Sequence, residues 1–192
     1  MQSKIILASA SPRRIEILKN HGLEAEVIPS RIEEYYDISA KPHILCMYNA
    51  LKKALDVYRR VAEGLIIAAD TIVYSGKVIG KPRDEDDAFN TLSMLRGHTH
   101  SVYSGVAFLN VWTAEKRVFY DKTDVTFSNY SDNDIREYIA TGEPMDKAGS
   151  YAIQGAWSRF VDLTVGDFSN VIGLPWQKLS VELERFDNRS DA

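Results

Sequence analysis

The strongest constraint on the fold is a strand, a turn and a helix signal at the start of the chain. The apolar run of residues 5–7 predicts a buried strand over residues 4–8, and small residues follow it. Pro12 then occupies the position that proline favours at the start of a helix, with Ser11 before it as the expected N-cap and Gly22 as the stop. A strand that leads through a tight turn into a helix predicts the first unit of an α/β sheet.

Helical and strand-like patterns alternate early in the chain, and strands follow one another later. Ile44 begins a long amphipathic pattern that ends before Gly64, and an apolar strand follows at residues 65–69. Residues 101–111 and 117–127 predict a long antiparallel pair. We therefore expect a mixed, twisted α/β sheet flanked by helices. The remaining predicted elements are a short strand around residues 25–28, a hairpin of residues 71–74 and 78–79, a helix from Asp84, a helix opened by a capping box at Ser131 and Asp134, short strands at 151–153 and 160–165, and a closing helix at 176–186.

Composition and charge limit the class of protein. The 192 residues are 45% hydrophobic and 26% charged, which predicts a single domain over residues 1–192, or one domain with a sub-lobe. We expect a flexible tail at about residues 187–192. The lone Cys46 excludes a disulfide framework and a cysteine-based zinc site, and we expect it in the core. A net charge of −4 argues against a broad nucleic-acid surface, and no stretch reaches membrane-spanning length. We expect a cytoplasmic protein with no stable nucleic-acid complex and no membrane partner.

Two arginines in the first turn of the predicted helix indicate an anion site. Arg13 and Arg14 follow Ser11, where helix N–H groups lack partners and the helix dipole already favours negative charge. Two cations are unfavourable there in an isolated helix, so their presence predicts a bound anion, with a phosphate chain as the natural one. The alternative is that both arginines are solvated or pair with a carboxylate such as Glu16.

Two acidic positions are candidate metal ligands. Asp70 ends the apolar strand at residues 65–69, where α/β sheets place ligand-binding groups, and Glu34 lies in an acidic loop that could reach the same edge. Carboxylate oxygens suit Mg²⁺ or Mn²⁺, which keep waters and substrate phosphates in their shell. The alternative is that Asp70 caps the turn at Thr71 and that Glu33 and Glu34 form a solvated pair.

Three further positions are weaker candidates. The stretch 76–82, GKVIGKP, resembles a phosphate-binding loop but is one residue short and has proline in place of the hydroxyl residue, which leaves Lys81 as a point charge for phosphate. Lys53 is a second such charge, or simply the wet face of its helix. Gln154 offers a donor and an acceptor to a base edge, or is a turn residue. His98 and His100 suit structural roles better than zinc binding.

Taken together, these segments resemble the Maf family of nucleoside triphosphate pyrophosphatases. The matching segments occur in family order along almost the entire chain, and the set is far more specific than any one piece. They are LASASPRR at 7–14, ADT at 69–71, GKP at 80–82, HSVYSG at 100–105, GEP at 142–144, DKAG at 146–149, IQG at 153–155 and VIGLP at 171–175.

The resemblance implies a mixed α/β fold related to the inosine triphosphate pyrophosphatases, with a substrate cleft between two lobes and commonly a homodimer. It implies metal-dependent hydrolysis of a nucleoside triphosphate to the monophosphate and pyrophosphate. By family position Asp70 is the proton acceptor, and Arg13, Thr71 and Gln154 set substrate choice. Lys53, Lys81 and Glu34 also fall on site positions of the family.

The motifs around Lys147 and Gln154 resemble the branch that acts on dTTP and UTP. The alternatives are the branch that acts on 7-methyl-GTP, and a nucleotide-binding regulator of cell division with little turnover. The sequence departs from the family pattern at Arg31, at His98 and in the segment 156–158. We expect Trp157 of that segment to narrow the base pocket.

Overall fold

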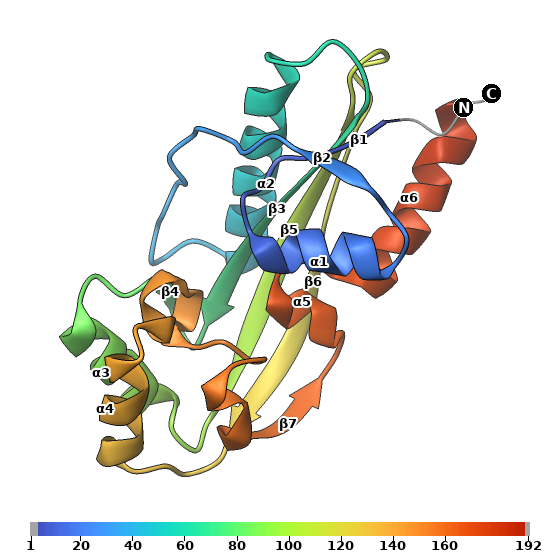
Figure 1. Ribbon diagram of the computed structural model, residues 1–192. Helices are drawn as coiled ribbons and strands as arrows, with labels where there is room; N and C mark the ends of the chain where they lie inside the picture. Colours follow the sequence, from blue (N-terminus) through green and yellow to red (C-terminus); the bar gives the residue numbers. More distant parts are fainter. Residues whose placement is uncertain (1–3, 191–192) are drawn as a thin grey trace.

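A single mixed sheet organises the molecule. The computed structural model describes residues 4–190, with side chains for residues 4–186. Within that part of the chain the sheet has seven strands in the order β2-β1-β3-β5-β6-β7, and β4 pairs with β3 (Figure 1). The strands are β1 (Ile5–Leu7), β2 (Ala25–Val27), β3 (Leu65–Tyr74), β4 (Val78–Ile79), β5 (Thr99–Asn110), β6 (Lys116–Phe127) and β7 (Val161–Val165).

The strand directions confirm the mixed α/β prediction. β1 runs parallel to both β2 and β3, and the helices of the early part of the chain connect these strands. The pairs β3–β5, β5–β6 and β6–β7 are antiparallel. The helices are α1 (Pro12–Asn20), α2 (Pro42–Tyr58), α3 (Glu85–Leu95), α4 (Asp132–Ala140), α5 (Phe168–Ile172) and α6 (Trp176–Ser190), with 3-10 turns at Glu143–Asp146, Ala148–Ser150 and Ala156–Phe160.

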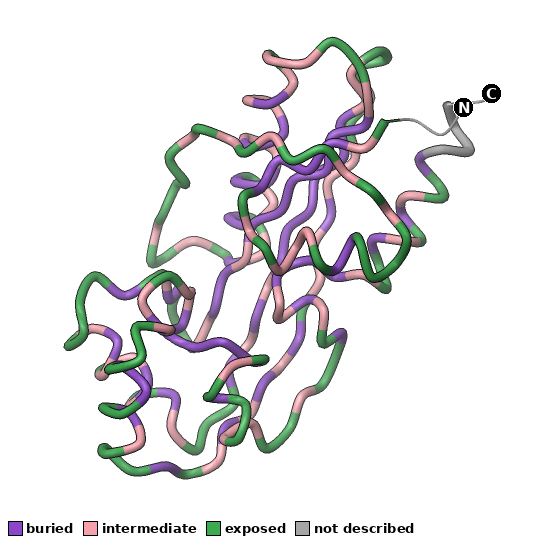
Figure 2. Tube along the Cα trace, viewed as in Figure 1, coloured by how far each residue is buried: buried purple, intermediate pink, exposed green. Residues whose placement is uncertain are grey.

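Alternation along β3 assigns its side chains to two faces. Ile66 and Ala68 pack against α2 in one hydrophobic cluster, whereas Leu65, Ile67 and Ala69 pack against α1 and α6 in another. Figure 2 shows the central strands as the most continuously buried part of the chain. Because the side-chain period of a strand is two, Asp70 faces α2 and Thr71 faces the side of α1.

A close approach of backbones holds α2 on the sheet. Gly105 of β5 is paired with Asp70 of β3, and a Cβ atom at this glycine would overlap the backbone of Cys46 and Met47 on α2. Only a glycine leaves room for this contact. Cys46 itself is fully buried, as predicted, and burial raises the pKa of its thiol to about 12.

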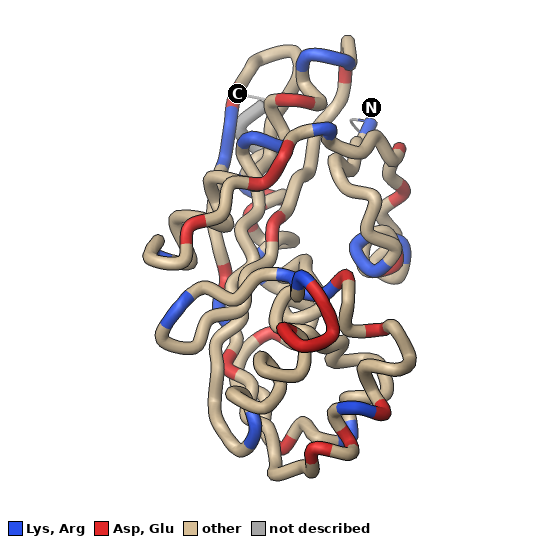
Figure 3. The backbone as a smooth tube through the Cα atoms, turned by 90° about the vertical axis from the view of Figure 1, so that its left-hand side faces the viewer, with Lys and Arg blue, Asp and Glu red and all other residues tan. Residues whose placement is uncertain are grey.

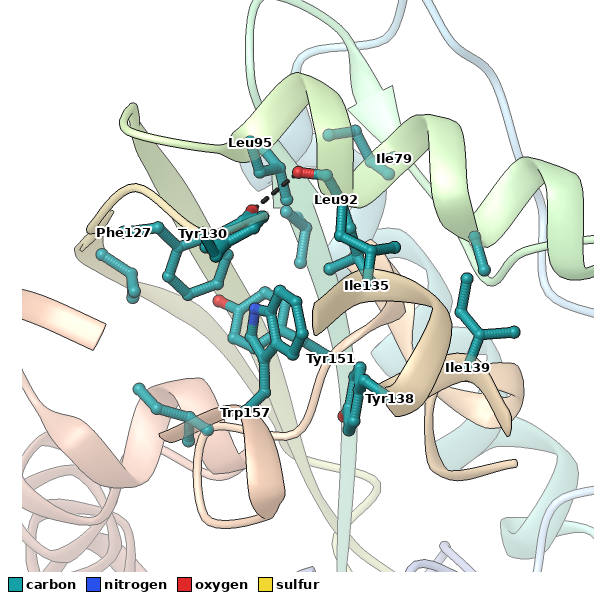
Figure 4. Packing of buried hydrophobic residues seen from close by; sticks show 14 of the residues in the cluster. Ile79, Leu92, Leu95, Phe127, Tyr130, Ile135, Tyr138, Ile139, Tyr151 and Trp157 are labelled. Atoms are coloured by element: carbon teal, nitrogen blue, oxygen red, sulfur yellow. Dashed lines mark hydrogen bonds between the residues drawn. The ribbon is translucent and has the colours of Figure 1, made fainter. Parts of the chain in front are cut away.

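A separate hydrophobic cluster lies at the other end of the sheet. It is built from α3, α4, the ends of β5 and β6, and the 3-10 turns (Figure 4). Trp157 stands in its middle at 1% exposure, with the rings of Tyr130 and Tyr138 each 4.7 Å away. The expectation that Trp157 narrows a base pocket is therefore wrong, because aromatic packing draws it into the core.

Three other expectations need correction. Residues 65–74 form one strand, so Asp70 lies in the middle of β3 and not at its end, because pairing with β5 continues without a break. Residues 151–153 are buried without strand pairing, and the short helix α5 was not predicted. The closing helix continues beyond 186 to Ser190, and residues 191–192 of the predicted tail lie outside the described part.

Along the backbone in Figure 3, the positions of Lys and Arg are interspersed with those of Asp and Glu over the whole length of the molecule. This pattern agrees with the small net charge of −4. Among the described residues, no helix combines the length and apolar character needed to cross a membrane.

Candidate active site

A cleft of about 600 Å³ opens beside the middle of β3. β1 pairs with β3 only as far as Ile67, and β4 pairs from Val73 onward, so residues 68–72 have no described strand on that side. Segments from both ends of the sheet line the gap. All nine residues predicted from the sequence lie in this lining: Ser11, Arg13, Arg14, Glu34, Lys53, Asp70, Thr71, Lys81 and Gln154.

A buried lysine joins the two predicted acidic residues. Lys53 Nζ lies 2.7 Å from Asp70 Oδ1 and 2.6 Å from Glu34 Oε1, and it also donates to the Ala69 carbonyl at 3.3 Å. Lys53 is thus neither a solvated helix face nor free toward the cleft. Its ammonium compensates the charge of Asp70, which is almost completely removed from water.

The charge of Glu34 depends on the same arrangement. Burial acts to raise the pKa of Glu34, but attraction and a hydrogen bond from Lys53, with further attraction from Lys81 and Arg14, outweigh it. The pKa of Glu34 is therefore lower than its ordinary value. Both carboxylates lie in the cleft wall, and the prediction that Glu34 reaches the site of Asp70 is supported by these contacts.

Asn49 is a member of this cluster that the sequence analysis missed. It lies one helical turn before Lys53 on α2, is 2% exposed, and donates from Nδ2 to Asp70 Oδ2 at 3.0 Å. A polar residue at a core position of an amphipathic helix, four residues before a candidate lysine, was the available signal. This signal identifies Asn49 as a partner of Asp70 only in the folded structure, where α2 packs against β3.

Arg14 is anchored within the wall of the cleft. It donates to the Gly173 carbonyl at 2.8 Å, to Ser9 Oγ at 3.1 Å and to Thr71 Oγ1 at 3.1 Å. Burial lowers the pKa of Arg14, and attraction from Asp70 and Glu34 opposes that shift. Thr71 is held as well, because its hydroxyl also lies 2.8 Å from Ser104 Oγ.

Arg13 and Ser11 leave their side chains available. Arg13 lines the cleft, and no hydrogen bond or ion pair joins its guanidinium to another described residue. Ser11 occupies the predicted N-cap position, but its hydroxyl makes no capping bond, and its amide donates to Ser9 Oγ at 3.2 Å. The N-terminus of α1 therefore presents a cation and a hydroxyl to the cleft.

Two further predicted residues approach from other elements. Lys81 follows β4, is exposed, and is close enough to lower the pKa of Glu34. Gln154 lies in the loop after Tyr151, and its amide is exposed at the cleft with no partner among the described side chains. The cleft thus has both basic and acidic side chains near β3, and the exposed amide of Gln154 lies at its other end.

The histidines and the remaining departure have structural roles. His100 is buried, and its Nε2 lies 2.7 Å from the Tyr151 hydroxyl, while His98 is exposed with Nδ1 2.6 Å from the Arg96 carbonyl. Neither histidine lines the cleft. Arg31 is anchored outside the site through its amide, which donates to Asp56 at 3.0 Å. These contacts agree with the structural interpretation of the histidine pair.

Comparison with known proteins places this arrangement in a family. The family model described as "Maf-like protein" matches residues 4–186. A dTTP/UTP pyrophosphatase of Caldicellulosiruptor bescii is 45% identical over 187 residues, or 95% of this chain and 94% of that protein. Proteins of the same name from Bacillus cereus and Clostridium perfringens are each 44% identical over 96% of this chain, and over 96% and 97% of their own lengths.

Among solved structures, the Staphylococcus aureus Ham1 protein matches with a TM-score of 0.45 and 14% identity, over 65% of this chain and 71% of that chain. The family match spans nearly all described residues, and the relatives cover their own chains almost completely. The chain belongs to the Maf family.

Proposed function

We propose that this protein hydrolyses dTTP and UTP to the nucleoside monophosphate and pyrophosphate. The observation that carries the proposal is one cleft in which the buried carboxylate of Asp70 lies on the same lining as the cations Arg13 and Lys81. Such a cleft suits a substrate with a polyanionic chain and a reaction that needs a proton acceptor. The names of the relatives support dTTP and UTP over 7-methyl-GTP.

Asp70 is the proposed general base. It takes a proton from the water that attacks phosphorus, the bond from the α-phosphorus to the bridging oxygen breaks, and pyrophosphate leaves with that electron pair. Lys53 and Asn49 hold the two oxygens of Asp70, so its orientation is set before substrate arrives. Arg13, Ser11 and Lys81 bind the phosphates, because their polar ends are free at the cleft.

Asp70 and Glu34 are the residues that would hold a divalent cation. Among the described residues, no three His, Cys, Asp or Glu side chains form a complete metal cage. Two carboxylates in one wall nevertheless fit Mg²⁺ or Mn²⁺, which bind through one or two carboxylates together with substrate phosphates. The ion would supply charge neutralisation on the triphosphate. The homodimer and the cytoplasmic location remain predictions.

Pyrophosphate release from a panel of nucleotides tests the function. The panel contains dTTP, UTP, dCTP, GTP and 7-methyl-GTP, each with Mg²⁺ or Mn²⁺. We expect dTTP and UTP to be the preferred substrates. Asp70→Asn should reduce turnover by at least about 10³-fold while the variant still binds nucleotide, because only the proton acceptor is lost. An Asp70→Asn protein with normal turnover would place the base elsewhere.

Gln154 tests the choice of base. Thymine and uracil present an N–H group beside a carbonyl, which one carboxamide can pair with, whereas methylated guanine has another pattern and a larger outline. Gln154→Ala should therefore reduce the preference for dTTP and UTP over 7-methyl-GTP. The side chain is exposed, so the melting temperature should not change. An unchanged preference would remove Gln154 from base recognition.

A further inference from the structure

Asn49 uses its whole carboxamide to join Asp70 to the backbone of Tyr35, the residue that follows Glu34. Nδ2 donates to Asp70 Oδ2 at 3.0 Å and to the Tyr35 carbonyl at 3.0 Å, and Oδ1 accepts from the Tyr35 amide at 2.9 Å. The orientation of the amide is determined by these partners. A flipped amide would set Oδ1 against a carboxylate oxygen and a carbonyl oxygen, with no hydrogen bond to either.

Lys53 and Asn49, both on α2, hold different atoms of Asp70 and of the acidic segment. Lys53 holds Asp70 Oδ1 and the side chain of Glu34, and Asn49 holds Asp70 Oδ2 and the backbone of the next residue, Tyr35. The connection between β2 and α2, residues 28–41, has no helix or strand of its own. Its acidic segment is therefore fixed to α2 by these side chains, one charged and one neutral.

The difference in charge matters when a triphosphate enters the cleft. The Lys53 side chain is a positively charged ammonium group. A polyanion bound beside it would therefore compete with Asp70 and Glu34 for its hydrogen bonds and its charge. Asn49 is neutral and 2% exposed, so a bound phosphate has no comparable electrostatic attraction to it. Of the two contacts to Asp70, the one from Asn49 is independent of the charge of the bound ligand.

We propose that Asn49 is a positioning residue that holds the Asp70 carboxylate in a fixed position relative to the Glu34 segment during turnover. It touches neither substrate nor the reacting water, and it acts through Asp70 and the backbone of Tyr35. The inference rests on the proposed function, because it assumes that Asp70 is the base. It adds a residue outside the nine predicted from the sequence and outside the lining of the cleft.

Two substitutions separate the hydrogen bond that Asn49 accepts from the two that it donates. Asn49→Asp retains an oxygen that accepts from the Tyr35 amide but removes the donor to Asp70 and to the Tyr35 carbonyl. Asn49→Leu has similar volume and removes all three hydrogen bonds. Tyr130→Phe is the matched control, because it deletes a buried hydrogen bond, 2.6 Å from the Tyr130 hydroxyl to the Leu92 carbonyl, in the cluster of Figure 4, and neither residue lines the cleft.

Steady-state pyrophosphate release from dTTP with Mg²⁺ gives kcat and KM for the full-length proteins. We expect kcat to fall about 10²-fold in both Asn49 variants, the cost of misplacing a catalytic group. For Asn49→Leu, which adds no charge, KM should stay within about threefold, because the phosphate contacts of Arg13, Ser11 and Lys81 are intact. Tyr130→Phe should lower the melting temperature and keep kcat. Wild-type kcat in either folded Asn49 variant, or an equal fall in Tyr130→Phe, would overturn the proposal.

A second readout does not depend on activity. Hydrogen exchange of the Tyr35 amide, followed by NMR without nucleotide, should be at least about tenfold faster in Asn49→Leu than in the wild type and stay slow in Asn49→Asp. Should the wild type release no pyrophosphate, the proposed function fails, and this measurement still decides whether Asn49 holds the segment. Unchanged exchange in Asn49→Leu would overturn that role.

Discussion

Lys53 and Asp70 form a buried ion pair, with Nζ 2.7 Å from Oδ1 and side-chain exposures of 10% and 7%. Lys53→Met should lower the free energy of unfolding by about 3–5 kcal/mol, because it leaves the Asp70 charge without its partner. Urea denaturation measures the loss. Combining it with Asp70→Asn should recover part of the stability in a double-mutant cycle. A loss below about 1 kcal/mol in the single variant would contradict the pairing.

The two neighbouring arginines should separate binding from stability. Arg13 has no hydrogen bond or ion pair to any described residue, so Arg13→Ala should keep the melting temperature and raise KM for dTTP about 10- to 100-fold, the worth of a charged hydrogen bond. Arg14 makes three hydrogen bonds, so Arg14→Ala should cost about 2 kcal/mol of stability. Thermal melts and steady-state kinetics on both variants test this prediction. A lower melting temperature in Arg13→Ala together with a raised KM only in Arg14→Ala would refute it.

Gly105→Ala should damage stability and turnover together. The added methyl group would overlap the backbone of Cys46 and Met47 and displace α2, which carries Lys53. We expect a loss of about 3 kcal/mol, near the upper end for overpacking. Gly80→Ala is the control, because its methyl group would meet only the exposed Tyr36 ring at 3.1 Å and should cost less than about 1 kcal/mol. Equal losses in urea denaturation would contradict this account.

His100 should make stability depend on pH. Burial lowers its pKa from 6.5 to about 4, with Asp124 opposing the shift. Between these two pH values the unfolded chain binds a proton at His100 that the folded protein does not bind. The contribution of His100 to the free energy of unfolding is therefore independent of pH above pH 6.5 and decreases as the pH falls toward 4. The full difference is about 3 kcal/mol.

Urea denaturation at pH 7, 6 and 5 measures this dependence, and His100→Phe should have a shallower slope than the wild type. The slope is the relevant quantity, because the variant also leaves the Tyr151 hydroxyl without its partner. Identical slopes would show that His100 is not held neutral in the fold.

Local signals in the sequence were enough for most elements. Pro12 and the capping pair Ser131 and Asp134 start helices where they were expected, and the long antiparallel pair β5–β6 follows from two extended patterns. These signals depend on neighbours within a few residues, which the sequence contains directly. Asp70 was misplaced at a strand end because a polar residue interrupts the apolar run, whereas pairing with β5 carries β3 past it.

The sequence by itself determined the family motifs and nine of the residues that line the cleft. Only the tertiary structure decided how they are used, with Lys53 between two carboxylates, Arg14 tied to Gly173 and Asn49 joined to Asp70. These contacts join residues far apart in the chain, and they depend on strand register and on the approach of α2 over Gly105. Residue type and spacing specify which groups are present, but packing of the whole chain sets which of them meet.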